Sequence, residues 1–342
     1  MTDSSVSEPE DGPAVVAFGG GHGLAASLAA LRRVTRRLTA VVTVADDGGS
    51  SGRLRAELGM LPPGDLRMAL ATLAADDVES AGWADVLQHR FTGYGSLGGH
   101  AVGNLLLAGL VDRLKDPVAA LDAAARLVHA AGRVLPLSRN AIDIAAEVSG
   151  LDGGGDAGGR VQLRGQVAVA TTRGRVRSVR LLPDAPEACV EAVAAVGEAD
   201  VLVLGPGSLF TSMLPHLLVP EMADAINRAD ARRVLVLNLA PQPGETSGFA
   251  PETHLEVLAD HAPLLRFDTV LADPETVADA DALRRAAAAL GAELQLSPVG
   301  VSGEARHDPV RLAAAFRTAF GDAPWRAKTS SLGAVHKPPP DA

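Results

Sequence analysis

Short apolar runs alternate with longer amphipathic segments along most of this chain. Residues 14–18, 39–45 and 200–204 are rich in valine and leucine, which favours buried parallel strands. The segment 24–34, which follows the first run, repeats apolar residues at helical spacing and is predicted to be a helix. A strand, a crossover helix and a second strand form a βαβ unit. The chain therefore predicts an α/β fold of the Rossmann type, with a mostly parallel sheet flanked by helices.

The same alternation returns in the second half of the chain, after residue 185. The next strands and helices are predicted from the same periodicities. The predicted strands cover residues 233–239 and 267–272, and the predicted helices cover residues 188–196, 220–229, 252–261 and 279–290.

The middle of the chain departs from this alternation. Residues 76–150 look helical. Residues 161–182 alternate with period two around a glycine-containing turn, which predicts a β-hairpin or two antiparallel strands after the glycine-rich loop 152–159. We expect this part to be an insertion in a single α/β domain. The expected organisation is a polar leader over residues 1–13, the domain over residues 14–322 with its insertion at about 76–185, and a disordered tail over residues 323–342.

Glycine is concentrated in the loop GGGHGL after the first predicted strand. Gly21 to Ala26 fit the relaxed G-x-G-x-x-A dinucleotide fingerprint. Together with Gly20 and Gly23, this loop would let the N-terminus of the next helix approach a phosphate. A tight strand-to-helix turn also requires glycine, so both interpretations stay open. His22 is placed either to bond a ligand phosphate or to cap the turn.

The second predicted strand ends in a loop of a different kind, DDGGSSGRLR. Its two aspartates suit ribose hydroxyls or a divalent cation, with Mg²⁺ as the candidate metal. Its glycines and serines offer N–H and hydroxyl donors to an anion, and its first arginine offers a bidentate donor to phosphate. A solvated turn with a helix N-cap at one of the serines is the alternative. The residues concerned are Asp46, Asp47, Gly48, Gly49, Ser50, Ser51 and Arg53.

Two more loops follow predicted strands later in the chain. Residues 205–208 read GPGS, and residues 238–246 read NLAPQPGET, with two prolines that stiffen the loop. Two glycine loops at strand ends suggest a ligand with two recognised ends, or two phosphate groups held apart. The alternatives are an ordinary turn with Ser208 as the helix N-cap, and a helix that begins at Glu245 and Thr246.

Three polar residues between these loops are also candidates. Asp65 follows a Pro-Pro-Gly turn and is expected to cap a helix over residues 66–75. His100 and Asn104 are four residues apart and would share one helix face. That pair suits either a ligand contact or a histidine satisfied at a helix end.

Composition and charge exclude several classes of protein. The 342 residues carry a formal net charge of −10, which argues against nucleic-acid binding, and the arginine clusters at residues 32–37 and 173–177 are expected to be solvated surface. The single cysteine, Cys189, excludes an internal disulfide and is expected to be buried and structural. The acidic start of the chain does not resemble a signal peptide, and no run is apolar enough to span a bilayer. We therefore expect a cytoplasmic protein.

The loops taken together resemble one known family. The segments GGGHGL, TVADDGGSSGRLR, LPPGDLR, GHAVGNLLLAGL, LGPGSLFTSMLPHLLVP and NLAPQPGETSGF have the order and spacing of the CofD-like YvcK family, over roughly residues 15–272. Members of that family are called gluconeogenesis factors or UDP-N-acetylglucosamine-binding proteins. The resemblance implies a Rossmann-like, CofD-like core with inserted helices, akin to a transferase that joins 2-phospho-lactate to a deazaflavin.

The resemblance also implies a function. It points to a cytosolic regulator that binds a UDP-sugar and affects carbon flux into cell-wall precursors and cell shape, with a protein partner and a homodimer as further expectations. No resident cofactor is expected beyond Mg²⁺ as a candidate, and no catalytic residue is assigned. The ligand-binding residues expected on these grounds are Gly20, Gly21, His22, Gly23, Asp46, Asp47, Gly48, Gly49, Ser50, Ser51, Arg53, Asp65, Arg67, His100, Asn104, Gly205, Gly207, Ser208, Asn238, Gln242, Glu245 and Thr246.

Three other functions remain open at the level of the sequence. A metal-dependent transferase acting on a nucleotide diphosphate would use Asp46 or Asp47. An NAD-linked oxidoreductase would explain the first fifty residues but gives no role to the later loops. A pure interaction protein would use the serines and threonine of the tail as a phosphorylation switch.

Overall fold

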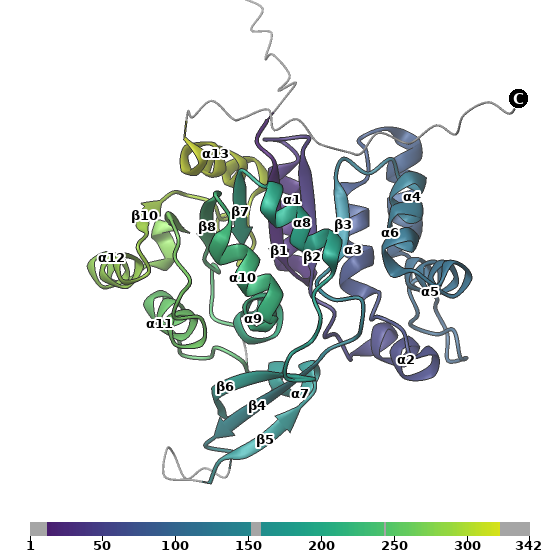
Figure 1. Ribbon diagram of the computed structural model, residues 1–342, viewed down its shortest axis with the longest axis horizontal. Helices are drawn as coiled ribbons and strands as arrows, with labels where there is room; N and C mark the ends of the chain where they lie inside the picture. The colour runs from purple at the N-terminus through teal and green to yellow at the C-terminus, as the bar shows by residue number, and fades with distance from the viewer. Residues whose placement is uncertain (1–11, 152–158, 243, 322–342) are drawn as a thin grey trace, which may run out of the picture.

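A seven-stranded parallel sheet forms the centre of this computed structural model, which describes residues 12–151, 159–242 and 244–321 (Figure 1). In the described residues the strand order is β10-β9-β8-β7-β1-β2-β3. The predicted α/β fold is thus confirmed. The strands are β1 (Val15–Gly19), β2 (Leu38–Val42), β3 (Arg133–Pro136), β7 (Val201–Leu204), β8 (Arg232–Val236), β9 (Thr269–Ala272) and β10 (Glu293–Leu296).

The order in which successive strands are added to the sheet reverses at β1. The chain runs from β1 outward to β2 and β3, and later from β7 outward to β10 on the other side of β1. Phe18 in β1 is in register with Val41 in β2 and with Leu204 in β7, so the carboxyl ends of the three strands lie together. Ligands of open α/β sheets bind at such a reversal.

Helices cover both faces of the sheet. Because right-handed crossovers run in opposite directions from β1, the two sets of helices lie on opposite faces. One face carries α1 (Gly21–Leu31), α3 (Gly64–Leu73) and α13 (Pro309–Phe320), and both α3 and α13 pack on α1. The other face carries α8 (Val190–Glu198), α9 (Leu214–Leu218), α10 (Pro220–Arg228), α11 (Pro251–His261) and α12 (Ala280–Ala289).

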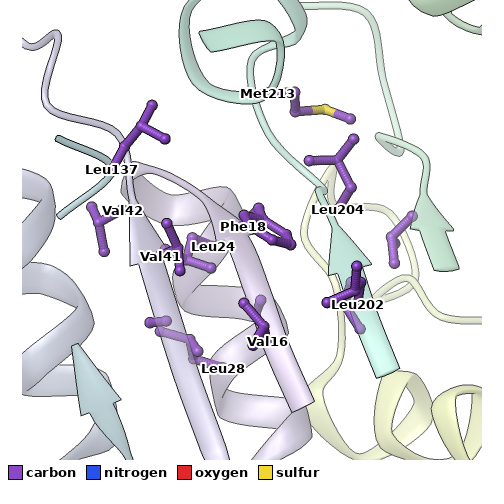
Figure 2. Close-up of a cluster of buried hydrophobic side chains, with 14 of the residues drawn as sticks. Val16, Phe18, Leu24, Leu28, Val41, Val42, Leu137, Leu202, Leu204 and Met213 are labelled. Atoms are coloured by element: carbon purple, nitrogen blue, oxygen red, sulfur yellow. The ribbon is translucent and has the colours of Figure 1, made fainter. Parts of the chain in front are cut away.

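The core fills the space between the sheet and the helices on both of its faces. Figure 2 shows Val16 and Phe18 of β1 and Leu24 and Leu28 of α1 among its side chains, and all four are almost completely buried. Burying one such side chain is worth roughly 1.5–3 kcal/mol. The first strand and helix therefore hold the glycine loop between them in a fixed position.

The predicted helical character of residues 76–150 was right as far as residue 127 and wrong after it. The first part contains α4 (Val78–Gln88), α5 (Val102–Leu114) and α6 (Pro117–Leu127). The last part contains β3, which pairs with β2 in the main sheet, and β4 (Asp143–Ser149). Short strands among alanine-rich helices give little periodicity by which to recognise them. The helices α4 to α6 pack beside α3 (Figure 1).

The predicted β-hairpin was also wrong. β5 (Val161–Arg164) and β6 (Arg175–Leu182) do not pair with each other, because each pairs with β4 in a small antiparallel sheet of order β5-β4-β6. Between them, Gly165 has a φ of +102° and precedes the short helix α7 (Gln166–Ala170). The small sheet and α7 lie at one end of the molecule (Figure 1).

Several smaller predictions needed correction. α1 begins at Gly21 rather than residue 24, and the acidic loop passes directly into α2 (Gly49–Leu58). A π-helix, η2 (Leu209–Met213), follows the second glycine loop, and β10, α13 and the short η3 (Pro274–Thr276) had not been predicted. Residues 1–11 of the leader, most of the glycine-rich loop 152–159 and the tail with its serines and threonine lie outside the described residues. In the described part of the chain, none of the helices has the length and apolar character that a bilayer crossing requires.

Candidate functional site

A cavity of about 440 Å³ opens at the carboxyl ends of β1, β7 and β8, where the strand order reverses. Four separate segments line it: the glycine loop with the start of α1, the second glycine loop with η2, the loop after β8, and a turn before α13. The lining residues are Gly20, Gly21, His22, Gly23, Ala26, Pro206, Gly207, Ser208, Ser212, Asn238, Leu239, Ala240, Pro241, Gln242, Ala305, Arg306 and His307.

The two glycine loops touch directly, and glycine is required for this. A Cβ on Gly23 would lie 2.3 Å from the Pro206 carbonyl oxygen and 2.6 Å from the Gly207 Cα, closer than atoms can approach. Ser27 of α1 adds a hydrogen bond from its Oγ to the Gly205 carbonyl, 2.7 Å long. The N-terminus of α1, which has no acidic residue in its first turn, is thereby fixed at the cavity.

The loop after β8 holds the second glycine loop in place. The side-chain amide of Asn238 accepts a hydrogen bond from the Gly207 N–H at 2.9 Å and donates one to the Gly207 carbonyl at 2.7 Å. The buried carboxylate of Glu245 accepts hydrogen bonds from Ser208 Oγ and from the Phe210 N–H. Burial raises the pKa of Glu245, although these hydrogen bonds act in the opposite direction. Asn238 and Glu245 are therefore supports of the loop.

Thr246, predicted as a ligand residue, is completely buried and closes its own loop. Its Oγ1 accepts a hydrogen bond from the Gln242 N–H at 2.8 Å. The side chain of Gln242 lines the cavity, and its Oε1 is buried without a hydrogen-bond partner. Of these two residues, Gln242 is the one placed to meet a ligand.

Charge distinguishes this cavity from the rest of the protein. Among the described residues that line it, none is an aspartate or glutamate, and Arg306 is the only one with a permanently charged side chain. The chain as a whole has a net charge of −10. A carboxylate-free cavity beside a helix N-terminus favours an anionic ligand.

The acidic loop after β2 lies next to this cavity but does not line it. Asp46 accepts a hydrogen bond from the Gly48 N–H at 2.9 Å, and the exposed Asp47 accepts one from the Val167 N–H of α7 at 2.9 Å. The two predicted metal ligands are therefore engaged by different elements. The described residues contain no group of three or more His, Cys, Asp or Glu side chains arranged to hold a metal ion. Mg²⁺ at Asp46 and Asp47 stays a prediction.

The two serines of the acidic loop are buried and serve the fold. Ser50 Oγ is 2.9 Å from His100 Nδ1 and accepts a hydrogen bond from Asn104 Nδ2 at 2.9 Å. Ser51 Oγ accepts one from the Gly64 N–H at 2.9 Å. The structure thus brings His100 and Asn104 together at Ser50, where they join α2 to the start of α5. They do not share one helix face as predicted, because His100 precedes α5, which begins at Val102. Arg53 is engaged as well, because its guanidinium donates to the Gly98 carbonyl at 2.8 Å.

Asp65 lies between the acidic loop and the cavity, and Arg67 is close to it. Asp65 does not cap α3, whose N-cap is Pro63, but instead accepts a hydrogen bond from the Gly21 N–H of α1. Burial and the nearby Asp46 carboxylate raise the pKa of Asp65 to about 7. Burial lowers the pKa of Arg67, whose Nε has no hydrogen-bond partner. A carboxyl group with a pKa this far from its ordinary value, next to a cavity, is typical of a functional site.

We expect the Asp65→Asn variant to be more stable than the parent protein at pH 8. The raised pKa means that the folded protein holds a proton more tightly than the unfolded chain. The contribution of Asp65 to stability is thus present below pH 3.8 and is lost as the pH rises through about 7. Removing this penalty should add on the order of 1 to 2 kcal/mol at pH 8. Urea unfolding at pH 5 and pH 8, with a chelator present, measures the effect.

The exposed Asp281 on α12 supplies the control for that experiment. Asp281→Asn should leave the difference in unfolding free energy between pH 5 and pH 8 unchanged. If Asp65→Asn behaves in the same way as Asp281→Asn, Asp65 does not titrate near neutral pH.

The turn that carries Ala305, Arg306 and His307 is the part of the cavity that the sequence did not predict. It contains no repeated glycine and no motif. The one local signal is Asp308-Pro309, which begins α13 with Asp308 as its N-cap. Nothing in that signal places the turn against β1 and β8, since it follows an edge strand in the sequence.

The fold and the cavity define a doubly wound α/β protein with a polar pocket at its topological switch point, an arrangement common among nucleotide-binding proteins. The chain belongs to the CofD family: the profile described as "2-phospho-L-lactate transferase CofD" matches residues 15–303. This confirms the resemblance seen in the sequence.

Proteins similar to this chain are named gluconeogenesis factors. The relative of that name from Bacillus subtilis is 38% identical over 267 residues, 78% of this chain and 80% of the relative. A relative from Mycobacterium tuberculosis, which bears the name provisionally, is 55% identical over 303 residues, 88% of each chain. A crystal structure of a UPF0052 family member from Bacillus halodurans superposes with a TM-score of 0.79 at 34% identity, covering 88% of this chain and 97% of that one.

Proposed function

We propose that this protein binds a nucleoside diphosphate sugar, UDP-N-acetylglucosamine, in the switch-point cavity and acts as a regulator rather than an enzyme. The observation that carries the proposal is the cavity itself. It lacks carboxylates in a strongly acidic protein, and it is formed by a helix N-terminus and a second glycine loop. Both features favour a diphosphate, and an elongated ligand suits a cavity with walls from four segments.

The regulatory role is supported by the relatives. Proteins named gluconeogenesis factors share most of the length of this chain. In the proposed role, occupancy of the cavity by a cell-wall precursor sugar reports on carbon supply in the cytoplasm. The bound protein then acts through a protein partner, affecting carbon flux to the cell wall and cell shape. A homodimer remains part of this proposal.

Calorimetric titration with UDP-N-acetylglucosamine, UDP-glucose and NAD, each with and without Mg²⁺, tests the proposal. We expect the parent protein to bind a UDP-sugar selectively and to form no product. Asn238→Ala removes both hydrogen bonds that hold Gly207, so it should weaken binding at least about tenfold.

The exposed Asn140 provides a matched control, and Asn140→Ala should bind like the parent protein. Absence of UDP-sugar binding in the parent protein would refute the proposed function. Equal affinities in Asn238→Ala and Asn140→Ala would place the binding site elsewhere.

One observation favours a second candidate, a metal-dependent transferase. Burial and the nearby Asp46 carboxylate raise the pKa of Asp65 beside the N-terminus of α1, and the matched family profile is described as a transferase. In this alternative, Asp46 and Asp47 hold Mg²⁺ against a diphosphate. Its test is product formation from a nucleoside diphosphate substrate with Mg²⁺, abolished in Asp46→Asn or Asp47→Asn. Binding without turnover in the parent protein would count against it.

A further inference from the structure

The small antiparallel sheet concentrates positive charge in an acidic protein. Residues 159–182 contain six arginines and neither aspartate nor glutamate, although the whole chain has a net charge of −10. These residues form β5, α7 and β6, which lie with β4 at one end of the molecule (Figure 1). Charge of one sign that gathers on a single small sheet favours contact with a surface of the opposite sign.

The two faces of this small sheet differ in character. One face carries Ile144 and Val179, which are buried in the hydrophobic core. On the other face, Arg164 of β5 and Arg180 of β6 lie on either side of Ala145 in β4, because both are in register with it. The two arginine side chains are 69% and 48% exposed. We call this second face the outer face, and it is basic and open to solvent.

The outer face already binds carboxylates from within the chain. Arg164 donates to Asp143 Oδ2 from Nε at 2.9 Å and from Nη2 at 2.5 Å. Arg160 donates from Nη1 to Glu147 Oε2 at 2.8 Å. Burial would raise the pKa of Asp143, but its arginine partners lower it. A guanidinium presents a planar fork of donors that matches a carboxylate, so these pairs show the chemistry that this face can offer to another molecule.

Other arginines of this region keep donors available. Arg173 and Arg175 are exposed, and in the part of the chain that the structure describes neither of them pairs with a carboxylate. Arg180 pairs with Asp184, a contact between two exposed side chains at 3.1 Å. Such a surface pair contributes little and yields readily to a better partner. The region therefore carries more positive charge than its own carboxylates neutralise.

The small sheet also contacts two of the loops that follow strands of the main sheet. Asp47 of the acidic loop accepts a hydrogen bond from the Val167 N–H of α7 at 2.9 Å. In the loop after β8, a Cβ on Gly244 would lie 2.4 Å from the Ala170 carbonyl oxygen, so this loop packs closely against the end of α7. The small sheet is therefore fixed beside the switch-point cavity, but its arginines are not among the described residues that line that cavity.

The size and composition of the outer face favour an acidic peptide segment over other polyanions. Three strands form a face about 10–15 Å wide, and the longest of them, β6, has eight residues. A nucleic-acid duplex or an anionic bilayer extends well beyond such a face and would meet the acidic remainder of the protein, which repels it over a Debye length of about 8 Å. The three strands contain no aromatic residue on which unpaired bases could stack. Two identical outer faces would repel each other.

We propose that the outer face of the small sheet is a docking surface for an acidic segment of a partner protein, whose carboxylates pair with Arg164, Arg175 and Arg180. The inference rests on the proposed function for the role of that partner, whereas docking itself needs no ligand in the cavity. The regulator proposed above acts through another protein, and this face provides a place for it outside the ligand cavity.

The experiment measures binding of a short fluorescent peptide that alternates glutamate and threonine, by anisotropy at low and physiological ionic strength. The full-length proteins are the parent, the face variant Arg164→Gln/Arg180→Gln and the control variant Arg228→Gln/Arg284→Gln. Arg228 and Arg284 lie on α10 and α12, are 75% and 59% exposed, and each pair with a nearby aspartate. Both double variants change the net charge by the same amount, so they differ only in where the charge is removed.

We expect the parent protein to bind the glutamate peptide and the face variant to bind it at least about tenfold more weakly. The control variant should bind like the parent, and a peptide that alternates glutamine and threonine should not bind. Urea unfolding checks that the variants fold. If the face variant is unfolded, Arg175→Gln with Arg284→Gln as its control gives the same comparison, because Arg175 has no ion pair to lose among the described residues.

Three results would overturn the inference. The first is absence of peptide binding by the parent protein, and the second is an equal loss in the face and control variants, which would reduce the effect to net charge. The third is tighter binding of a DNA duplex or of phosphatidylglycerol vesicles than of the peptide, which would assign the face to another class of partner.

Calorimetric titration of the same proteins with UDP-N-acetylglucosamine separates this inference from the proposed function. Both double variants should bind the nucleotide sugar like the parent protein. If no protein binds it, the proposed function fails, while the peptide measurements still decide whether the outer face is a docking surface. Loss of nucleotide-sugar binding in the face variant alone would show that the small sheet belongs to the ligand site and would also overturn the inference.

Discussion

Replacing Gly23 by alanine is expected to abolish tight binding of UDP-N-acetylglucosamine and to destabilise the protein. The added Cβ would meet the Pro206 carbonyl oxygen at 2.3 Å and the Gly207 Cα at 2.6 Å. Both neighbours are backbone atoms, so no rotation of a side chain can relieve the clash. The two glycine loops must separate, which moves the N-terminus of α1 away from the second loop and disrupts both walls that would hold a diphosphate.

The size of this effect follows from the cost of overpacking. Forcing extra atoms into a well-packed site costs about 1–3 kcal/mol, and the displaced loop should lower ligand affinity by a factor of at least about 100. Chemical denaturation and calorimetric titration measure the two quantities on the same preparation.

Gly109 supplies the matched control. It lies within α5, as Gly23 lies within α1, but a Cβ at Gly109 would meet no atom within 4 Å. Alanine favours a helix over glycine by up to about 1 kcal/mol, so Gly109→Ala should stabilise the protein and leave binding unchanged. If both alanine variants are stabilised, the contact between the glycine loops is not needed.

Acidification is expected to destabilise the protein through His216. This side chain is completely buried under the sheet, where its Nε2 is 3.0 Å from the Val41 carbonyl oxygen and its ring packs edge-on to Phe18. Burial lowers its pKa from 6.5 to about 4. The folded protein therefore binds this proton more weakly than the unfolded chain does.

The contribution of His216 to stability is fully present above pH 6.5 and is lost as the pH falls toward about 4. The shift corresponds to roughly 3 kcal/mol. His307 acts in the same direction, whereas Asp65 acts in the opposite one. Comparing the parent protein with His216→Gln isolates the contribution of His216 to the pH dependence of stability, because both proteins contain His307 and Asp65.

Denaturant unfolding of the parent protein and His216→Gln between pH 7.5 and pH 4.5 measures this difference. Glutamine keeps an N–H donor for the Val41 carbonyl but does not titrate. We expect His216→Gln to be less stable at pH 7.5, and the gap between the two proteins to narrow steadily as the pH falls. A gap that stays constant would show that His216 is protonated equally in the folded and unfolded states.

The sequence by itself determined the local elements around the cavity. Apolar runs followed by glycine identified β1 and β7 and the loops after them, because parallel strands require apolar side chains on both faces and a sharp exit requires glycine. It also determined that Cys189 would be buried, as the structure confirms. These are properties of short segments, and periodicity reveals them directly.

Segments without strong periodicity could not be assigned in this way. β3 is a strand of four residues among helices. β4 lies between β5 and β6, which would be direct neighbours in a hairpin. Pairing between distant strands depends on burial against the rest of the protein. Local alternation therefore predicted strands at residues 161–182 but not their partner.

Only the tertiary structure decided which candidate residues face a ligand. The order of strands around β1 brings the loops after β1, β7 and β8 to one cavity and turns Ser50 and Ser51 inward to α5 and α3. It also brings Arg306 to that cavity from the turn before α13, whose base is held by Asp273. The sequence shows which chemical groups a residue carries. Whether its polar atoms bond to the protein or remain available to a ligand depends on neighbours that are distant along the chain.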